Sequence, residues 1–482
     1  MATKLVDALR QENALTENGM NTNSSSLNAI VDLFFNIGAM RGQDKQRLIA
    51  TFSKAFYQDP SRAMKILFWV RDVRGGAGER QIFRDIVQYL AENHERSIAV
   101  NIQHIPEFGR WDDLLAFEGT KLEKMAFSLI QKALREGGTL CNKWMPRKGK
   151  TAAKLRNYMG MSPKQYRKTL VEGTNVVEQL MCAKRWEDID FSKLPSVASA
   201  RYQKAFWKNA KESYETYIGK LQSGEAKINA GAVYPYDVVK SLKMGNAAVA
   251  TEQWKALPNY LEGSNEMILP MVDVSGSMRT PAGGNTNLSC MDVAISLGLY
   301  ISERNEGPFK DAFLTFSANP ELQVLNGDLK ARYGQLSRAG WGMNTNIQAA
   351  FNKILDQAVK HKVTADQMPD KILILSDMQF DQATRSHTGW RRTEDLPEWN
   401  PTAQQLIEKM YADAGYKAPK VVYWNIQSRG GDIPVAFDKT GTALISGFSP
   451  SIMTSILGAE DFTSVAIMDK TIMGERYSRI SA

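Results

Sequence analysis

Residues 267–278 read MILPMVDVSGSM, an apolar run that ends in the alternating polar set Asp273, Ser275 and Ser277. The run has the length and composition of a buried strand, and Ser-Gly-Ser is typical of a turn that leads into a helix. A tight loop after a strand can turn the carboxylate and both hydroxyls to one side. The segment therefore predicts a strand of an α/β sheet with three oxygen ligands at its carboxyl end.

Two further segments add oxygen ligands to this set. Thr345 lies in the loop sequence GMNTN before a helical pattern, and Asp377 follows the apolar run KILILS, residues 371–376. A hard cation such as Mg²⁺ prefers oxygen ligands in near-octahedral geometry. Two carboxylates and three hydroxyls do not fully neutralise the ion, so the site would accept an acidic group from a partner. The alternative is an ordinary strand-to-helix turn in which Asp273 or Ser275 caps the helix.

Beyond residue 265 the sequence alternates between strand-like and helical patterns. This alternation predicts an α/β domain with a mostly parallel sheet. Residues 386–400 are polar and rich in Trp and Arg, which indicates an exposed loop beside Asp377. We expect strands at 267–273, 311–317, 371–376, 420–426 and 442–446, and helices at 289–304, 346–360, 401–414 and 450–459.

The first half of the chain is predicted to be all-α. Consecutive short helical patterns with short links favour helix pairs stacked as a solenoid. We expect a flexible segment at 1–23, a helical-repeat domain at 24–265 with a connector from about 222, and the α/β domain at 266–482. Helices are expected near 47–56, 63–70, 79–92, 121–136, 163–182 and 196–221.

The two halves differ in charge. Residues 1–260 contain 39 Lys and Arg against 27 Asp and Glu, whereas residues 261–482 contain 21 against 25. Residues 143–168 hold nine basic and no acidic side chains, interleaved with Trp144, Tyr158 and Tyr166. Cations bind phosphates, and aromatic faces stack on unpaired bases, so this mix predicts a surface for single-stranded or structured RNA. A solvated helical face over core aromatics is the alternative.

The segment RDVRGGAGER, residues 71–80, adds two arginines to the RNA-binding candidates. Its glycines permit close approach of the backbone to a phosphate at a helix start. Alternatively, Arg71 and Arg80 pair with Asp72 and Glu79. The segment GRWDDL, residues 109–114, is interpreted as a structural turn with an internal ion pair. The candidate RNA-binding residues are Arg71, Arg74, Lys143, Arg147, Lys148, Lys150, Lys154, Arg156, Arg167 and Lys168.

These motifs resemble those of two known families. From about Met267 to the C-terminus the chain resembles a von Willebrand factor A domain with a metal-ion-dependent adhesion site, with a complete match at the five oxygen ligands. A plant, fungal and viral family that looks like a divergent relative of the Ro autoantigen (TROVE) proteins has similar motifs over nearly the whole chain. That resemblance implies a ring of HEAT-like helical repeats before a doubly wound α/β domain, and binding of small noncoding RNAs or the ends of misfolded RNAs. The motifs concerned are residues 71–80, 109–114, 162–168, 194–196, 423–426 and 446–450.

We therefore expect a non-enzymatic RNA-binding protein with Mg²⁺, or another divalent cation, in its α/β domain. The alternative is a protein-interaction module that grips an acidic partner residue through the metal, with the helical half as scaffold. A metal-dependent nuclease is a third hypothesis, but hydroxyl-rich ligands suit gripping better than hydrolysis. The three cysteines are far apart, no apolar run approaches the ~18 residues of a membrane span, and the N-terminus lacks a secretory pattern. These features favour a cytoplasmic setting.

Overall fold

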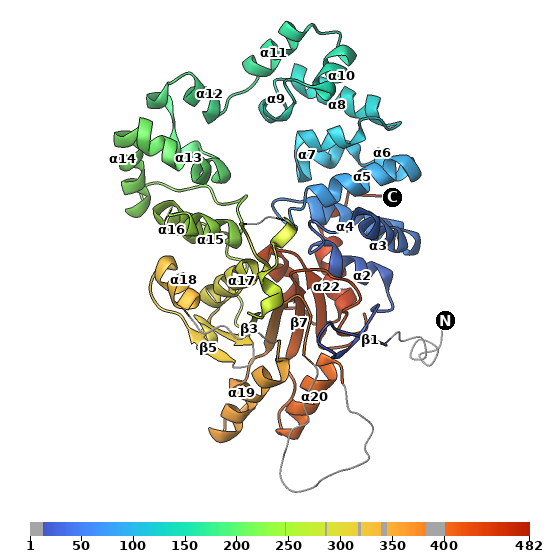
Figure 1. Cartoon of the computed structure of the whole chain (residues 1–482), viewed down its shortest axis with the longest axis vertical. Coiled ribbons are helices and arrows are strands. Elements are labelled where there is room, and N and C mark those ends of the chain that lie inside the picture. Colours follow the sequence, from blue (N-terminus) through green and yellow to red (C-terminus); the bar gives the residue numbers. More distant parts are fainter. Residues whose placement is uncertain (1–12, 246, 285–286, 317–319, 339–344, 382–400) are drawn as a thin grey trace. The chain divides into compact units, whose positions relative to one another are not determined.

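The computed structural model describes residues 13–245, 247–284, 287–316, 320–338, 345–381 and 401–482. The chain divides into two compact units, drawn together in Figure 1. The α/β unit contains the chain up to Gln43 together with Asn259–Thr471, and the helical unit contains Asp44–Pro258 together with Ile472–Ala482. The observed boundary after Pro258 lies close to the expected one. Residues up to Gln43, however, belong to the α/β unit, although the sequence placed residues 24–43 in the helical domain. Residues 472–482 belong to the helical unit, although the sequence placed them in the α/β domain.

A six-stranded sheet organises the α/β unit, in the order β5-β4-β3-β6-β7-β8. All neighbouring strands are parallel except β4 and β5. Every residue of β3, β6 and β8 is buried, so both faces of the sheet are covered there. The five expected strands are confirmed, whereas β5, which is mostly exposed, was not expected. The strands are β3 (Ile268–Asp273), β4 (Ala312–Phe316), β5 (Glu321–Val324), β6 (Lys371–Ser376), β7 (Lys420–Asn425) and β8 (Thr442–Ser446).

Helices pack closely on this sheet. Helix α17 contacts β3, β4 and β6, and a Cβ added at its Gly298 would lie 2.5 Å from Cγ2 of Val272 on β3. Helix α19 contacts β4 and α20. Three of the four expected helices are confirmed, and the fourth, expected at 450–459, is shorter. The helices are α17 (Cys290–Arg304), α18 (Leu329–Arg338), α19 (Ile347–Lys360), α20 (Ala403–Asp413), α21 (Met453–Ile456) and α22 (Ser464–Ile472).

The N-terminal segment belongs to the sheet and not to the helical repeats. Strands β1 (Asn13–Leu15) and β2 (Asn21–Asn23) pair antiparallel, although residues up to 23 were expected to be flexible. Helix α2 (Ala29–Ile37) packs on β7 and β8, and the Ser446 hydroxyl donates to the Phe34 carbonyl at 2.7 Å. Helix α2 buries Ile30, Val31, Leu33, Phe34, Phe35 and Ile37. A helix this apolar needs a wide surface to cover it, and the sheet supplies that surface.

The helical unit consists of short helices that pack on their sequence neighbours. Its late and early helices also meet, because the Tyr234 hydroxyl donates to the Val73 carbonyl at 3.3 Å. The expected helices near 47–56, 63–70, 79–92 and 121–136 are confirmed, whereas the patterns at 163–182 and 196–221 each form two helices. The helices are α3 (Lys45–Gln58), α4 (Pro60–Arg71), α5 (Gln81–Asn93), α6 (Glu95–Ala99), α7 (Ile105–Phe108), α8 (Glu123–Arg135), α9 (Thr139–Trp144), α10 (Lys150–Tyr158), α11 (Pro163–Glu172), α12 (Val177–Cys182), α13 (Ser196–Asn209), α14 (Lys211–Gln222), α15 (Pro235–Lys243) and α16 (Ala247–Lys255).

The C-terminal tail completes the helical unit. The buried Asp72 carboxylate, at the end of α4, accepts hydrogen bonds from Arg476 Nη2 at 2.7 Å and from the Tyr477 hydroxyl at 2.9 Å. Further along, the side chain of Asn101 bonds with the backbone of Ser481. A buried carboxylate needs such partners, which explains why the tail docks here and not on the sheet. None of the described helices combines the length and the apolar character that a membrane span requires.

Candidate metal site at the ends of the central strands

The strand order of the sheet reverses between β3 and β6, and the two acidic candidates, Asp273 and Asp377, lie at this reversal. Asp273 is the last residue of β3 and Asp377 directly follows β6, whose Leu375 pairs in parallel with Val272. Parallel neighbours end at the same edge of the sheet, so both carboxylates lie at one place. Open α/β sheets usually bind their ligands at such a reversal, outside the carboxyl ends of the strands.

Asp273 is fully buried and is held at both carboxylate oxygens. Its Oδ1 accepts from the Ser275 backbone N–H at 2.9 Å, and its Oδ2 accepts from the Ser376 hydroxyl at 2.5 Å. The Ser376 hydroxyl in turn accepts from the backbone N–H of Met378 at 3.0 Å. The carboxylate is therefore fixed in place by the loop that follows β3 and by the last residue of β6.

The serine hydroxyls link the two carboxylates. The hydroxyls of Ser275 and Ser277 are 3.0 Å apart, and the Ser277 hydroxyl hydrogen-bonds with Asp377. Asp377 Oδ1 also accepts from the Gln379 backbone N–H at 3.4 Å. The structure thus brings four of the five predicted ligands into one connected set.

Thr345, the fifth predicted ligand, is tied to the same edge of the sheet through its backbone. Its carbonyl accepts from the Asp381 N–H at 2.9 Å and from the Ile347 N–H at 3.1 Å. Asp381 lies shortly after Asp377, so the loop that carries Thr345 runs beside the segment that leaves β6. The Thr345 side chain is buried. Residues 339–344, just before it, lie outside the described part of the chain.

Burial raises the pKa of both carboxyls, and at Asp273 the charge of Asp377 adds to this effect. Burial, followed by the charge of Asp377, raises the pKa of Asp273 to about 7. Burial also raises the pKa of Asp377, and the Arg429 guanidinium opposes this effect. Two buried carboxylates at one place are unfavourable without a cation, since each disfavours the charged form of the other.

The donor set fits a hard divalent cation. All five side chains offer oxygen, and Oδ2 of Asp377 is buried without a hydrogen-bond donor among the described residues. Met378, the next residue, has a φ of 65°, in the left-handed region that side chains other than Gly rarely adopt. Backbone strain of this kind often occurs at binding sites, where the surrounding contacts hold the strained conformation in place.

An arginine that the sequence did not single out lies against this set. Arg429 Nη2 is 3.3 Å from Asp377 Oδ2, and Arg429 Nη1 donates to Glu17 Oε2 at 2.7 Å. Glu17 itself is held by its backbone N–H, which donates to Gln379 Oε1 at 2.6 Å. An arginine in a loop carries no periodicity or spacing signal, and Glu17 is some 360 residues from Asp377 in sequence. Only the fold brings these groups together.

The N-terminal segment therefore runs along the candidate site. The Thr16 hydroxyl donates to the Phe380 carbonyl at 2.7 Å, and Asn18 Nδ2 donates to the Gln379 carbonyl at 2.8 Å. Gln379 Nε2 donates to Asp432, where burial raises the pKa of the carboxyl to about 6. The loop at 386–400, predicted to lie beside Asp377, is outside the described residues.

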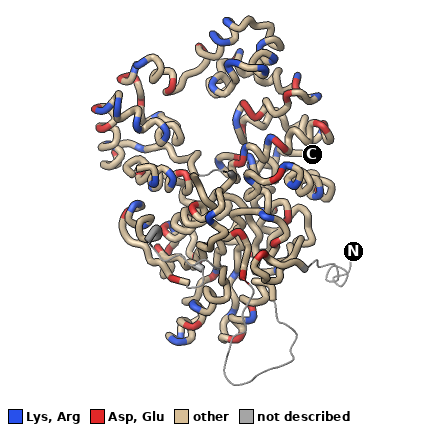
Figure 2. Tube along the Cα trace, in the orientation of Figure 1, with Lys and Arg blue, Asp and Glu red and all other residues tan. Residues whose placement is uncertain are grey.

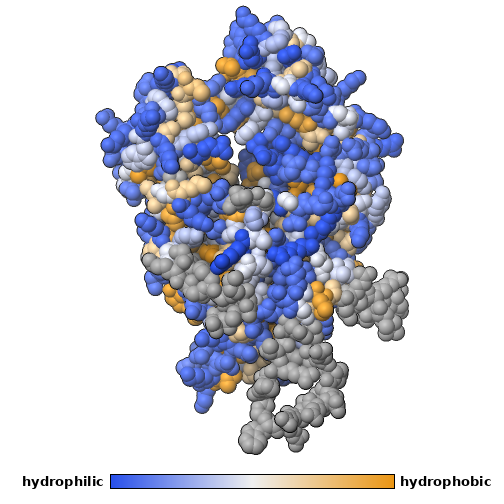
Figure 3. Space-filling view, viewed as in Figure 1, coloured by the Kyte–Doolittle hydropathy of each residue, from blue (hydrophilic) through white to orange (hydrophobic). Residues whose placement is uncertain are grey.

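The basic segment of the helical unit is mostly exposed. Lys143 pairs with Glu178 at 3.3 Å, Lys154 with Glu118 at 3.0 Å, and Lys168 with Glu172 at 3.5 Å. No acidic partner is seen among the described residues for Arg147, Lys148, Lys150, Arg156 or Arg167, and all but the half-buried Arg156 are exposed. In Figure 2 the charged positions along α9 to α11 are mainly blue, and Figure 3 shows hydrophilic side chains over most of the visible face of the helical unit.

Two of the three aromatic side chains in this segment are engaged inside the protein. Tyr166 is buried and donates its hydroxyl to the Pro146 carbonyl at 3.0 Å. The Arg110 guanidinium lies 3.5 Å from the ring centroid of Trp144. Tyr158 is 40% exposed, although its ring also makes an edge contact with Phe127 at 5.7 Å between ring centroids. The expectation of three stacking aromatics is therefore corrected to one.

Arg71 is a structural residue and not part of an exposed surface. It is 2% exposed, and its Nε and Nη2 both lie 2.7 Å from Oδ2 of the buried Asp113. This bidentate pair replaces the suggested pairing with Asp72. Arg74 is exposed, as the RNA-binding hypothesis requires. The internal ion pair expected at residues 109–114 is confirmed between Arg110 and Asp112.

Two families match consecutive parts of the chain. The domain of unknown function DUF2828 matches residues 16–133 and 122–267, and the domain of unknown function DUF7788 matches residues 268–478. The chain is also similar to the uncharacterized protein L728 of Acanthamoeba polyphaga mimivirus, with 28% identity over 515 residues that cover 94% of this chain and 86% of that protein. Because the DUF2828 match extends over more than half of the residues of this chain, the chain belongs to the DUF2828 family.

Proposed function

We propose that this is a non-enzymatic RNA-binding protein of the Ro/TROVE type. Its helical unit, built from HEAT-like repeats, binds small or misfolded RNA. Its α/β unit is a doubly wound von Willebrand factor A domain that carries a Mg²⁺-dependent adhesion site. The two roles reside in different compact units, so each is argued and tested separately.

One observation carries the RNA-binding proposal. Within residues 143–168, six cationic side chains have no acidic partner among the described residues, and the segment itself contains no acidic residue. A cation that is already neutralised contributes little to phosphate binding, whereas these remain available to release counterions from RNA. The exposed Tyr158 adds a face for a stacked base, which is worth about 1–3 kcal/mol per base.

The strand order and the oxygen ligands support the von Willebrand factor A assignment. The order β5-β4-β3-β6-β7-β8 becomes 3-2-1-4-5-6 when the strands are numbered along the chain. The ligands lie at the ends of β3 and β6, where this order reverses. Asp273, Ser275, Ser277, Thr345 and Asp377 would hold the ion. A bound Mg²⁺ supplies a positive centre that attracts a carboxylate from a partner.

RNA binding is tested by filter binding of nuclease-treated protein to a structured RNA with a single-stranded tail, over a salt series. Reversal of charge at Arg147, Lys148 and Lys150 should weaken binding and reduce the slope of log affinity against log salt by about 2 to 3, since each lost phosphate contact removes 0.7–0.9. A matched control reverses Lys211 and Lys220, which are exposed in the same unit. Equal losses in both variants, or no loss in either, would remove the assignment of this segment.

A second candidate function is adhesion to an acidic protein through the metal site. The observation that favours it is the Glu17–Arg429–Asp377 arrangement, in which a glutamate of this chain already lies near the candidate site. A Glu-containing peptide should bind the Mg²⁺-loaded protein and lose binding after chelation or in Asp273→Ala. Peptide binding that survives both changes would contradict this role and leave RNA binding untouched.

A further inference from the structure

We propose that a pocket between α13, α15 and α16 of the helical unit is a binding site for a phosphorylated nucleotide. The inference deepens the proposed RNA binding. It rests on that proposed function only if the nucleotide is the end of an RNA chain. The pocket is separate from the basic segment at 143–168. It has a volume of about 570 Å³, within the usual range of ~300–1,000 Å³ for small-molecule sites.

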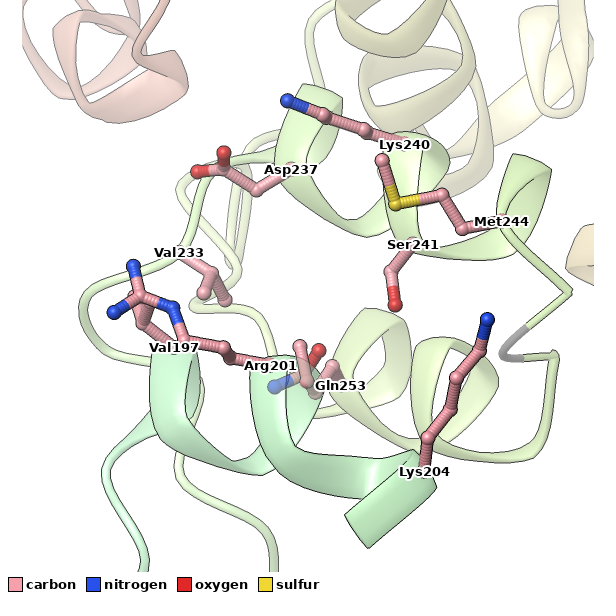
Figure 4. A pocket seen from close by; sticks show the side chains of 10 residues that line it. Val197, Arg201, Lys204, Val233, Asp237, Lys240, Ser241, Met244 and Gln253 are labelled. Carbon is pink, nitrogen blue, oxygen red and sulfur yellow. The ribbon is translucent and has the colours of Figure 1, made fainter. Parts of the chain in front are cut away.

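Helices α13 and α15 form the two sides of this nucleotide pocket. In Figure 4, Arg201 and Lys204 come from α13, and Lys240 and Ser241 from the facing α15. Gln253 of α16 lies between them. Both helices contact α16.

Positive charge exceeds negative charge around the pocket. Arg201, Lys204 and Lys240 line it, with Asp237 as the one carboxylate in the lining. Neither Lys204 nor Lys240 has an acidic partner within the described residues. The Asp237 carboxylate is engaged at the start of α15, where it accepts from the Tyr234 backbone N–H at 3.1 Å. Charge complementarity thus favours an anion, and mobile lysine ammonium groups suit a phosphate.

The rest of the lining suits a base and a sugar. Val197 and Met244 at the rim are 47% and 56% exposed, so they offer apolar contact to a ligand that enters from solvent. Deeper in, Ser241 and Gln253 are almost completely buried. Gln253 Nε2 donates to the Ser196 carbonyl at 2.8 Å, which holds the side-chain amide in one orientation. A fixed amide and a hydroxyl can read the polar edge of a base.

This combination separates a nucleotide from simpler anions. A free phosphate would use the cations but would leave the apolar rim and the buried polar floor without contacts. A base with a phosphate can meet all three features, because its flat apolar face, polar edge and anionic end are separate in space. The ligand can come from two sources, a free nucleoside monophosphate or the phosphorylated end of an RNA.

The test is calorimetric titration of the full-length, nuclease-treated protein with adenosine monophosphate and with adenosine. Binding of the monophosphate, with much weaker binding of adenosine, is the expected result. The double variant Arg201→Gln, Lys204→Gln should weaken monophosphate binding about tenfold or more, since charge-assisted hydrogen bonds are lost. Lys208→Gln, on the same helix but outside the lining, should bind as the wild type does.

A second variant protects the test against misfolding. Met244→Glu changes an exposed rim residue and places a negative charge at the mouth, so it should weaken the monophosphate without unfolding α15. If neither ligand binds, or if both pocket variants bind as the wild type does, the pocket proposal is overturned. The failure of RNA binding is a different result, because it would leave monophosphate binding to the pocket intact.

A short RNA with a terminal phosphate distinguishes the two sources. Displacement of bound monophosphate by this RNA, but not by the same RNA with a terminal hydroxyl, would support an RNA end as the ligand. Displacement by neither RNA, with monophosphate binding retained, would support a free nucleotide. Displacement by both RNAs equally, with no effect of the pocket variants on either, would place RNA elsewhere and contradict the pocket as an RNA-end site.

Discussion

Replacement of Arg429 by Met should tighten metal binding at the candidate site. Arg429 places a positive charge 3.3 Å from Asp377 Oδ2, the oxygen that has no hydrogen-bond donor among the described residues. A divalent ion at this carboxylate would be repelled by the guanidinium. Removal of the guanidinium removes this repulsion and also frees the carboxylate for the ion.

The size of the effect follows from Coulomb's law. A unit charge and a divalent ion about 4 Å apart interact by roughly 8 kcal/mol at an effective dielectric constant near 20. The Arg429 side chain is 22% exposed and also pairs with Glu17, so only part of this energy acts on the ion. If about a sixth remains, roughly 1.4 kcal/mol, the dissociation constant falls about tenfold.

Thermal unfolding in a magnesium series measures this change. At a concentration of 100 times the dissociation constant, the ion stabilises the wild-type unit by about 2.7 kcal/mol, which raises Tm by roughly 5–10 °C for a domain of this size. At the same concentration Arg429→Met should gain about 4.1 kcal/mol. Arg429→Lys keeps the charge and serves as the control. Calorimetric titration with Mn²⁺ gives the affinity directly.

The reasoning would be refuted by an Arg429→Met variant that binds the ion no more tightly than the wild type. In that case the guanidinium would be a support of the site and not a competitor for it. A variant that only has a lower stability in the absence of metal would not refute the reasoning. Loss of Arg429 leaves two buried carboxylates less compensated, and a lower metal-free Tm is expected for that reason.

Three further predictions concern pH, packing and the C-terminal tail. The pKa of Asp273 is raised to about 7 in the folded protein, above ~3.9 in the unfolded chain. The stability of the metal-free protein should therefore fall as pH rises from about 4 to 7. Stabilisation by magnesium should be larger at pH 8 than at pH 6 in parallel melting series. Gly298→Ala places a Cβ 2.5 Å from Cγ2 of Val272, and should destabilise the α/β unit by about 1–3 kcal/mol in denaturant unfolding, with an unchanged midpoint arguing against the tight packing. Arg476→Met removes a partner of the buried Asp72 and should destabilise the helical unit by about 2 kcal/mol. Arg476→Lys keeps the charge and should lose less stability. Equal losses of stability in the two variants would mean that charge is not the cause.

The secondary structure of both units was largely readable from local pattern. The apolar runs before Asp273 and Asp377 are confirmed as strands, and the periodicity after Ser289 is confirmed as helix α17. Such signals depend on residues that are near in sequence, and side-chain burial reinforces them on both faces of the sheet. Strand β5 escaped detection because it is short and mostly exposed, so it lacks an apolar run.

Helix α2 shows where local pattern stops being informative. Its residues lie in the part of the chain that was predicted to be all-α, but they could not show that this helix packs on β7 and β8 and not on the helices that follow it. Packing partners are set by which apolar surfaces are left to cover, and this is known only when the sheet has formed. The C-terminal tail belongs to the helical unit for a different reason, because Arg476 and Tyr477 donate hydrogen bonds to the buried Asp72 carboxylate.

The amino-acid sequence by itself indicated the candidate oxygen ligands, because each follows an apolar strand or opens a helix, and parallel strands end at one edge of a sheet. Only the tertiary structure decided their electrostatic surroundings. Arg429 and Glu17 meet Asp377 across hundreds of residues, and Arg71 is buried against Asp113 instead of lying on the surface. Charge pairing depends on distance in space and on burial, and neither quantity is written in the order of residues along the chain.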